Sequence, residues 1–98
     1  MRLEAQEVAA IKAAARQVFG ADATVRLFGS RVDDARRGGD IDLHIETAQP
    51  VDIWQVKDDF LERLFERIDE QRVDVIVTTR GTPPRPIEAI AYRDGIIL

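Results

Sequence analysis

Apolar and polar positions alternate without interruption across residues 40–46. The apolar positions are Ile41, Leu43 and Ile45, and the polar positions are Asp40, Asp42, His44 and Glu46. A period of two is typical of a β-strand that buries one face, so Asp40 and Asp42 are expected to point the same way. Two residues so placed lie roughly 6.5 to 7 Å apart along a strand, which allows both carboxylates to reach one metal ion or a close pair of ions.

Two further runs predict strands on either side of this one in the sequence. Residues 73–77 (VDVIV) repeat the alternation, and Asp74 falls on the polar face. If this strand and the strand at 40–46 share one core, Asp74 joins the other two carboxylates. Residues 24–28 (TVRLF) are rich in β-branched and aromatic side chains and predict a strand that ends at Gly29.

Helical spacing of apolar residues predicts three helices, at about residues 3–19, 53–70 and 87–93. In the second, Asp52 and Gln55 have the spacing of an N-terminal capping box. The apolar stripe of this helix consists of Ile53, Val56, Phe60, Leu64 and Ile68. Residues 78–86 are expected to form a loop, stiff and extended where three of its last four residues are proline.

Four features admit more than one interpretation. Trp54 is expected to pack in the core or at its rim rather than to stack on a cofactor, and it could also anchor a partner protein. His44 is expected to neighbour a metal site rather than to bind the ion, because Mg²⁺ prefers oxygen ligands. Tyr92 is expected to pack in the interior, with modification of its side chain as the alternative. The apolar residues 96–98 either dock on the chain's own core or contact another chain.

Composition restricts the class of protein. With 98 residues, the chain is expected to form a single domain over residues 1–98. A net charge of −4 and a pI near 4.9 argue against a nucleic-acid-binding surface, which needs a basic face. The N-terminal segment contains neither an apolar signal region nor a membrane span, and we expect a cytoplasmic protein. The chain has no cysteine, which excludes disulfides.

The turn after the first predicted strand has the chemistry of an anion site. Gly29 has no Cβ, so a ligand can approach its backbone, and Ser30 offers a hydroxyl and can cap a helix. A strand followed by a small turn and a helix start leaves backbone N–H groups pointing outward. Arg31, Arg36 and Arg37 add positive charge. A triphosphate is therefore expected to be held between these groups and a magnesium ion on the carboxylates.

Gly29-Ser30, a loop of nine residues, Asp40-Ile41-Asp42 and the later Asp74 resemble the signature of the DNA polymerase β-like nucleotidyltransferase superfamily. More narrowly, the chain resembles the minimal nucleotidyltransferases that act as antitoxins beside HEPN-domain toxins. The loop is one residue shorter than the spacing most common in that minimal family. The resemblance implies an α/β (α+β) fold, in which helices flank a small mixed β-sheet like that of the polymerase β palm.

The resemblance also implies an activity and a set of site residues. Asp40, Asp42 and Asp74 would be catalytic and would hold two Mg²⁺ ions, while Gly29, Ser30 and Arg31 would bind the nucleotide. Asp74 would also help to deprotonate the incoming hydroxyl. The substrate would be ATP, and its AMP would pass to a tyrosine hydroxyl of a HEPN ribonuclease toxin.

Two alternatives remain open at this stage. The chain could neutralise a toxin by binding alone, although a pure binder has no evident need for Gly29, Ser30 and three aspartates. Transfer to a small molecule such as an aminoglycoside is disfavoured, because no second domain is evident in the sequence to hold the acceptor.

Overall fold

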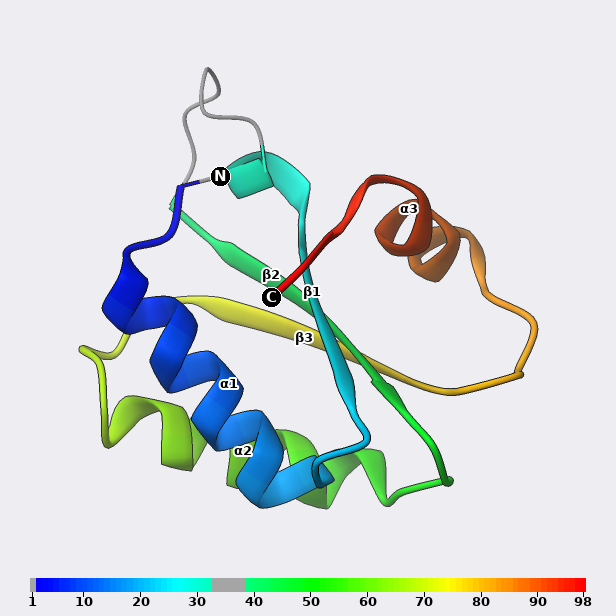
Figure 1. Cartoon of the computed structure of the whole chain (residues 1–98), viewed down its shortest axis with the longest axis horizontal. Coiled ribbons are helices and arrows are strands. Elements are labelled where there is room, and N and C mark those ends of the chain that lie inside the picture. Colours follow the sequence, from blue (N-terminus) through cyan, green and yellow to red (C-terminus); the bar gives the residue numbers. More distant parts are fainter. Residues whose placement is uncertain (1, 33–38) are drawn as a thin grey trace.

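The computed structural model describes residues 2–32 and 39–98, which form one mixed sheet and the helices that cover it (Figure 1). The strands are β1 (Thr24–Phe28), β2 (Ile41–Thr47), β3 (Val73–Thr79) and β4 (Ile96–Ile97). The helices are α1 (Ala5–Phe19), α2 (Ile53–Phe65) and α3 (Pro86–Asp94), together with the short 3₁₀ helix η1 (Gly29–Val32). The fold class expected from the sequence is confirmed.

The sheet has the strand order β3-β2-β1-β4. β1 pairs antiparallel with β2 and with β4, whereas β2 and β3 run parallel. Two parallel neighbours need a crossover connection, and α2 provides it. This arrangement places β2, the strand with the regular alternation, between β1 and β3.

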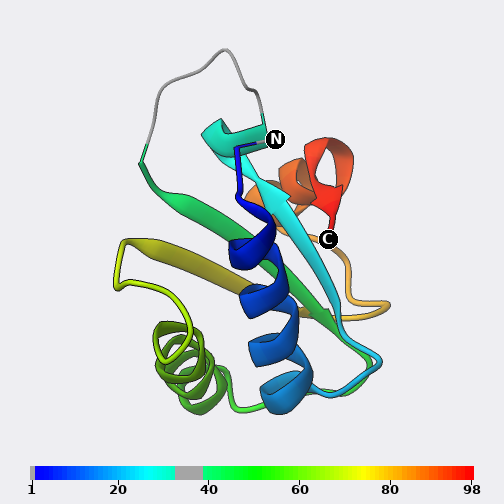
Figure 2. The ribbon, with the colours of Figure 1, turned by 60° about the vertical axis from the view of Figure 1, so that its left-hand side comes forward.

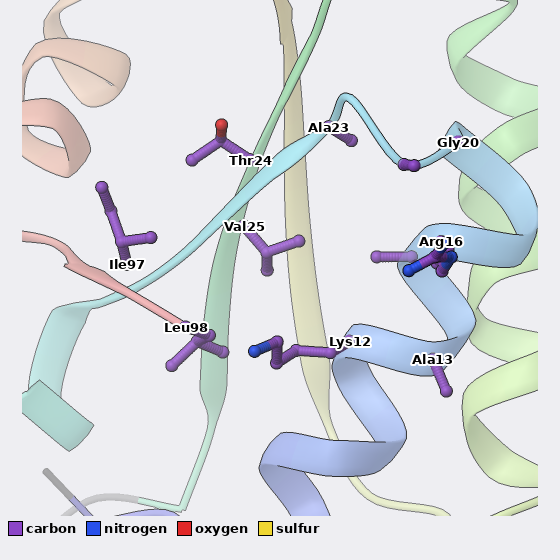
Figure 3. Close-up of a pocket in the computed structure, with 11 residues that line it drawn as sticks. Lys12, Ala13, Arg16, Gly20, Ala23, Thr24, Val25, Ile97 and Leu98 are labelled. Carbon is purple, nitrogen blue, oxygen red and sulfur yellow. The ribbon is translucent and has the colours of Figure 1, made fainter.

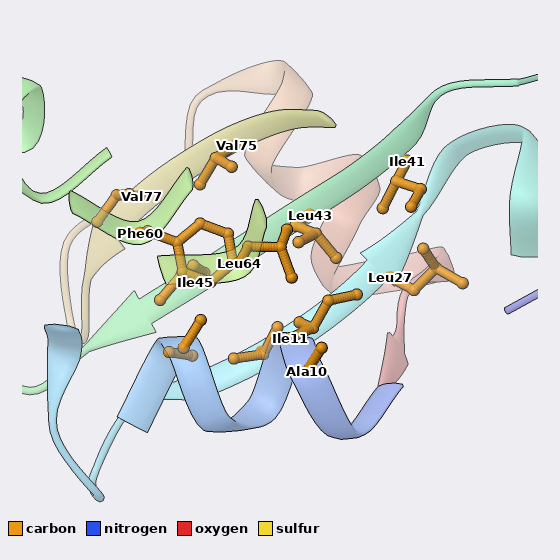
Figure 4. Close-up of a cluster of buried hydrophobic side chains, with 13 residues drawn as sticks. Ala10, Ile11, Leu27, Ile41, Leu43, Ile45, Phe60, Leu64, Val75 and Val77 are labelled. Atoms are coloured by element: carbon orange, nitrogen blue, oxygen red, sulfur yellow. The ribbon is translucent and has the colours of Figure 1, made fainter. Parts of the chain in front are cut away.

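Helices cover both faces of the sheet (Figure 2). α1 and α2 lie together on one face, and α3 lies on the other. The main core fills the space between the sheet and the first two helices (Figure 4). Its fully buried members include Ile11, Leu27, Ile41, Leu43, Ile45, Phe60 and Leu64. The odd-numbered residues of β2 therefore face this core, as the alternation predicts.

The other face of β2 differs from the sequence-based expectation. A strand with polar even positions is expected to leave them in water, yet His44 and Glu46 are buried. The reason is α3, which packs over this half of the strand and brings Tyr92 to within 4.8 Å of His44, measured between ring centroids. Only the beginning of the polar face, around Asp40 and Asp42, is left uncovered enough to be partly exposed.

The second helix begins as predicted and ends earlier. Asp52 caps it by accepting a hydrogen bond from the Gln55 backbone N–H at 3.3 Å. The helix stops at Phe65, about five residues before the predicted end, where the backbone N–H of Ile68 still bonds to the Leu64 carbonyl. Ile68 reaches the core from this turn. Among the described residues, no helix combines the length and apolar character needed to cross a membrane.

Two apolar residues at the start of α2 do not pack as expected. The side chain of Trp54 is 81% exposed, so the prediction of core packing is wrong, and Ile53 is 43% exposed although it lies on the predicted stripe. Both lie in the first turn of the helix, whereas the buried residues are Phe60 and Leu64.

The C-terminal segment docks on the chain's own sheet. Ile96 and Ile97 form β4 against β1, and the Leu98 N–H donates to the Val25 carbonyl at 2.9 Å. Pro86 begins α3 as its first residue, a position that needs no N–H donor. β3 ends at Thr79 and α3 begins at Pro86, so the loop between them covers residues 80–85 and is shorter than the predicted loop at 78–86.

Candidate active site

Strand register brings two of the predicted carboxylates together. Asp42 on β2 lies directly opposite Asp74 on β3 in the parallel pair. Neighbouring strands are about 4.8 Å apart, and side chains opposite each other share a face. Asp40 lies two residues before Asp42. It is close to the start of β3, because Arg72, the residue before that strand, forms an ion pair with it. All three aspartates thus gather at one end of the sheet.

Gly29 lies against this group. It follows β1 directly, and the last residue of that strand, Phe28, is paired with Asp42. The backbone at Gly29 has a φ of +76°, in the left-handed region that favours glycine. A Cβ at this position would overlap the Oδ2 atom of Asp42. Both the conformation and the space therefore require glycine here.

The next two residues lie in η1 and are tied to backbone groups. The Ser30 carbonyl accepts a hydrogen bond from Arg2 at 3.5 Å. The Arg31 guanidinium donates to the carbonyl of Arg2 at 2.9 Å and to that of Gly39 at 2.8 Å. Arg31 thus joins the N-terminal segment to the residue that precedes Asp40. It also lines a polar hollow of about 520 Å³ on the side of the α2–β3 turn.

The predicted contribution of Arg36 and Arg37 lies outside the described residues.

Arg72 is a site residue that the sequence analysis did not identify. Its Nε atom lies 3.4 Å from Oδ2 of Asp40 and 3.8 Å from Oδ2 of Asp74. A signal was present in the sequence, because Arg72 precedes Asp74 by two residues and so shares its face of the strand. In the described part of the chain, it is the arginine that forms ion pairs with the predicted carboxylates.

Electrostatic repulsion is concentrated on Asp42. Burial raises the pKa of its carboxyl, and the charges of Asp74 and Asp40 raise the pKa further. Arg72 acts in the opposite direction and lowers it. A carboxylate crowded by two others is the arrangement that a bound cation relieves.

The donor set fits a magnesium ion in its chemistry. Asp40, Asp42 and Asp74 offer oxygen ligands, which Mg²⁺ prefers, and Arg72 shows that a positive charge is already accommodated beside two of them. Within residues 2–32 and 39–98, however, no three acidic or histidine side chains are gathered closely enough to hold a metal. Loading therefore requires these side chains to move together.

Farther along the same face lies a second group of polar residues, beneath α3. His44 is fully buried, and its Nε2 atom is 2.8 Å from Oγ1 of Thr78. Oγ1 of Thr78 is in turn 3.3 Å from the hydroxyl of Tyr92, which donates to Glu46 at 2.5 Å. We call Arg26, His44, Glu46, Thr78 and Tyr92 the covered network. His44 therefore neighbours the aspartates along the strand and is bonded within the fold.

Opposite charges compensate one another in the covered network. Glu46 lies 3.6 Å from Arg26 and 3.7 Å from Arg80. The hydrogen bond from Tyr92 lowers the pKa of Glu46, and the charges of the two arginines lower it further. Burial acts in the opposite direction and raises this pKa, but the net shift is downward. Burial and the charge of Arg26 lower the pKa of His44, so its imidazole is neutral at pH 7. The guanidinium of Arg26 also lies over the Tyr92 ring, 4.7 Å from its centroid.

A separate pocket of about 350 Å³ lies between the C-terminal half of α1, the start of β1 and the end of the chain (Figure 3). Lys12 and Arg16 line it together with small and apolar side chains such as Val25 and Leu98. None of the predicted site residues is among those that line it. The aspartate site is therefore separate from this pocket.

Comparison with known proteins agrees with the geometry. No curated protein matches the chain. The family model described as "Nucleotidyltransferase domain" matches residues 8–96, a span that contains Gly29, Ser30 and all three aspartates. With the mixed sheet, the glycine seated on Asp42 and Asp74 opposite it, this match shows that the chain belongs to the nucleotidyltransferase domain family.

Proposed function

We propose that this nucleotidyltransferase is the antitoxin of a toxin–antitoxin pair and transfers AMP from ATP to a tyrosine hydroxyl of a HEPN-domain ribonuclease toxin. The observation that carries the transferase activity is Gly29 seated against Asp42, with Asp74 opposite on the parallel strand. The choice of acceptor rests on the resemblance of the signature residues to the minimal antitoxin nucleotidyltransferases.

Each residue of the site has its own role in the proposed transfer. Asp40 and Asp42 would hold magnesium, with Asp74 completing the set, and the bound metal supplies charge neutralisation and alignment of the phosphates. Gly29 allows the phosphates to approach the backbone after β1, next to Ser30. Asp74 takes the proton from the tyrosine hydroxyl. The hydroxyl oxygen bonds to the α-phosphorus of ATP, and the bond from that phosphorus to its bridging oxygen breaks to release pyrophosphate.

A second candidate is an antitoxin that neutralises its toxin by binding alone. The arrangement of Arg72 favours it, because this side chain pairs with Asp40 and Asp74 and compensates charges that a metal would otherwise compensate. The exposed Trp54 would suit such a role as a contact residue. The two candidates differ in whether the toxin is chemically changed.

The test is the intact mass of a HEPN-domain protein encoded beside this chain, after incubation with the chain, ATP and Mg²⁺. Transfer predicts a gain of one or more AMP units. Asp42→Asn should slow this transfer by more than about 100-fold, because it removes a metal-binding carboxylate. Asp58→Asn is the matched control, since it removes the same charge from the exposed face of α2 and should leave transfer unchanged.

Each outcome decides between the candidates. An unchanged mass in a stable complex would support the binding antitoxin and reject transfer to this partner. Absence of any complex would reject the partner itself and favour a small-molecule acceptor. Equal transfer by the Asp42→Asn protein would show that the aspartates are not the catalytic site.

A further inference from the structure

We propose that Arg72 is a resident counter-ion of the aspartate site, which a divalent cation must displace from Asp40 and Asp74 before the site can load. This inference concerns the regulation of metal binding and rests on the proposed function of the same carboxylates. Arg72 would then set how readily the enzyme takes up its metal in the absence of nucleotide.

The first support is the geometry of the ion pairs. A single nitrogen, Nε of Arg72, lies within 4 Å of both carboxylates, at 3.4 Å from Asp40 and 3.8 Å from Asp74. The guanidinium therefore lies in the space between two groups that are predicted to bind the metal. A cation that draws these two carboxylates together competes with the guanidinium for the same oxygens.

The second support is the contrast between the backbone and the side chain of Arg72. Its carbonyl accepts a hydrogen bond from the Ile41 N–H at 3.1 Å, which fixes its Cα beside the start of β2. Its side chain is 74% exposed, and the side chains of Asp40 and Asp74 are about half exposed. The guanidinium can thus leave the carboxylates for solvent without disturbing the strand pair.

The third support is the balance of charge. Three carboxylates gather here, and Arg72 contributes one positive charge that lies close to two of them. It disfavours a divalent cation twice over, by occupying carboxylate oxygens and by direct repulsion. Ion pairs between exposed groups are weak, so Arg72 lowers the affinity for the cation only modestly and the cation can displace it. Exposed pairs of this kind correspond to roughly a two- to fivefold change in a binding constant.

The experiment is a titration with Mn²⁺ in the absence of nucleotide, followed by the electron paramagnetic resonance signal of the free ion. Arg72→Gln should bind Mn²⁺ about three- to tenfold more tightly than the unsubstituted chain, because both the competition and the repulsion are removed. Arg63→Gln is the matched control. Arg63 lies on α2 and forms an exposed ion pair with Glu66, the residue that follows the helix. Its substitution removes the same charge and should change the affinity less than twofold.

An unchanged or weaker affinity in Arg72→Gln would overturn the inference. So would an equal gain in Arg63→Gln, which would show only a general charge effect, and so would a lack of Mn²⁺ binding by both arginine variants. Binding by Arg72→Gln with none by the unsubstituted chain would support it. Asp42→Asn in the Arg72→Gln background should abolish the gain, and a gain that survives would overturn the inference by placing the ion elsewhere.

The two proposals fail separately. If Arg72→Gln tightens Mn²⁺ binding but no AMP is transferred, the counter-ion role stands and the proposed function is rejected. If AMP is transferred and the affinities for Mn²⁺ are equal, the proposed function stands and the role of Arg72 is rejected.

Discussion

The two ends of one sheet face use charged residues in opposite ways. At the open end, three carboxylates of like charge lie near one another: Asp40, Asp42 and Asp74. The largely exposed side chain of Arg72 forms ion pairs with two of them. At the other end, the covered network interleaves Glu46 with arginines and joins it to buried hydroxyl and imidazole groups. The same strand, β2, supplies acidic residues to both ends.

The difference follows from what covers each end. α3 excludes water from the covered network, and in a dry environment an unpaired charge is costly, so each charge there has a partner. The open end remains in contact with water, which allows repulsion among carboxylates to persist until a cation arrives. Charge is therefore compensated inside the covered network, whereas at the open end three carboxylates share one exposed arginine.

Among substitutions that leave all three aspartates in place, the largest expected effect comes from adding a methyl group at the open end. Gly29→Ala should lower AMP transfer by at least about tenfold, because its Cβ would displace the Asp42 carboxylate and could only be accommodated by a shift of the turn. The left-handed backbone adds a stability cost of about 1 to 2 kcal/mol. Transfer rate and urea denaturation measure the two effects separately.

Gly81→Ala is the matched control for this prediction. Gly81 has a similar φ of +87°, and nothing lies within 4 Å of a Cβ built there. The substitution should cost about the same backbone strain and leave transfer unchanged. Equal transfer by both alanine variants would contradict the close contact between Gly29 and Asp42.

A smaller effect is expected from opening the covered network. Tyr92→Phe removes the hydroxyl that donates to Glu46 and keeps the ring that packs on His44. Loss of a hydrogen bond to a charged group should reduce the free energy of unfolding by about 1.5 to 3 kcal/mol, measured by chemical denaturation. Transfer should be unchanged below the unfolding transition. A loss of transfer in folded protein would show that the two ends are coupled.

The covered network should also set the response to mild acid. Because the pKa of His44 is lowered in the fold, protonation favours the unfolded chain, and stability should fall as the pH drops below 6.5. Below about 4.5, Glu46 should add to the loss, because its lowered pKa stabilises the fold only while it is ionised. Denaturation from pH 7 to 5 measures the first step. His44→Gln should flatten that step, and an unchanged slope would contradict the assignment.

The smallest expected effect has the opposite sign. The pKa of Asp42 is raised in the fold, so ionisation of this carboxyl opposes folding, and Asp42→Asn should stabilise the metal-free chain at pH 7. The gain should shrink as the pH falls and disappear below the ordinary value of 3.8, where the carboxyl is protonated in both states. Thermal unfolding at pH 7 and pH 3.5 measures it. Destabilisation at pH 7 would show that Asp42 supports the fold.

Much of the fold could be predicted because local patterns determine it. Alternation and β-branched residues predicted the strands at 24–28 and 73–77, and the second of these extends to Thr79 in the structure. Of the two possibilities left open for the C-terminal apolar residues, the structure shows docking on β1. The faces on which Asp42 and Asp74 lie were also predicted by alternation, and these local features depend on short stretches of sequence. That the two residues lie opposite each other was expected only if their strands were neighbours, and the parallel register provides this.

The features that the sequence did not reveal depend on contacts between distant segments. The covering of His44 and Glu46 by α3 arises from a helix some forty residues away, and polar strand positions alone suggest solvent. Arg72 gains its position from the pairing of two strands. Ile53 is exposed because the apolar stripe of α2 reaches the core only from its middle onward, and Trp54 lies beside that stripe rather than on it.

The position of β3 has a consequence for the size of molecule that the site can serve. β3 is an edge strand, and no further strand lies outside it in the described residues. Asp74, with a side chain that is 53% exposed, therefore lies at the margin of the sheet. A hydroxyl carried on the surface of another folded protein can reach it sideways, with both proteins remaining intact. The protein acceptor proposed above would therefore be selected by docking of surfaces and not by enclosure.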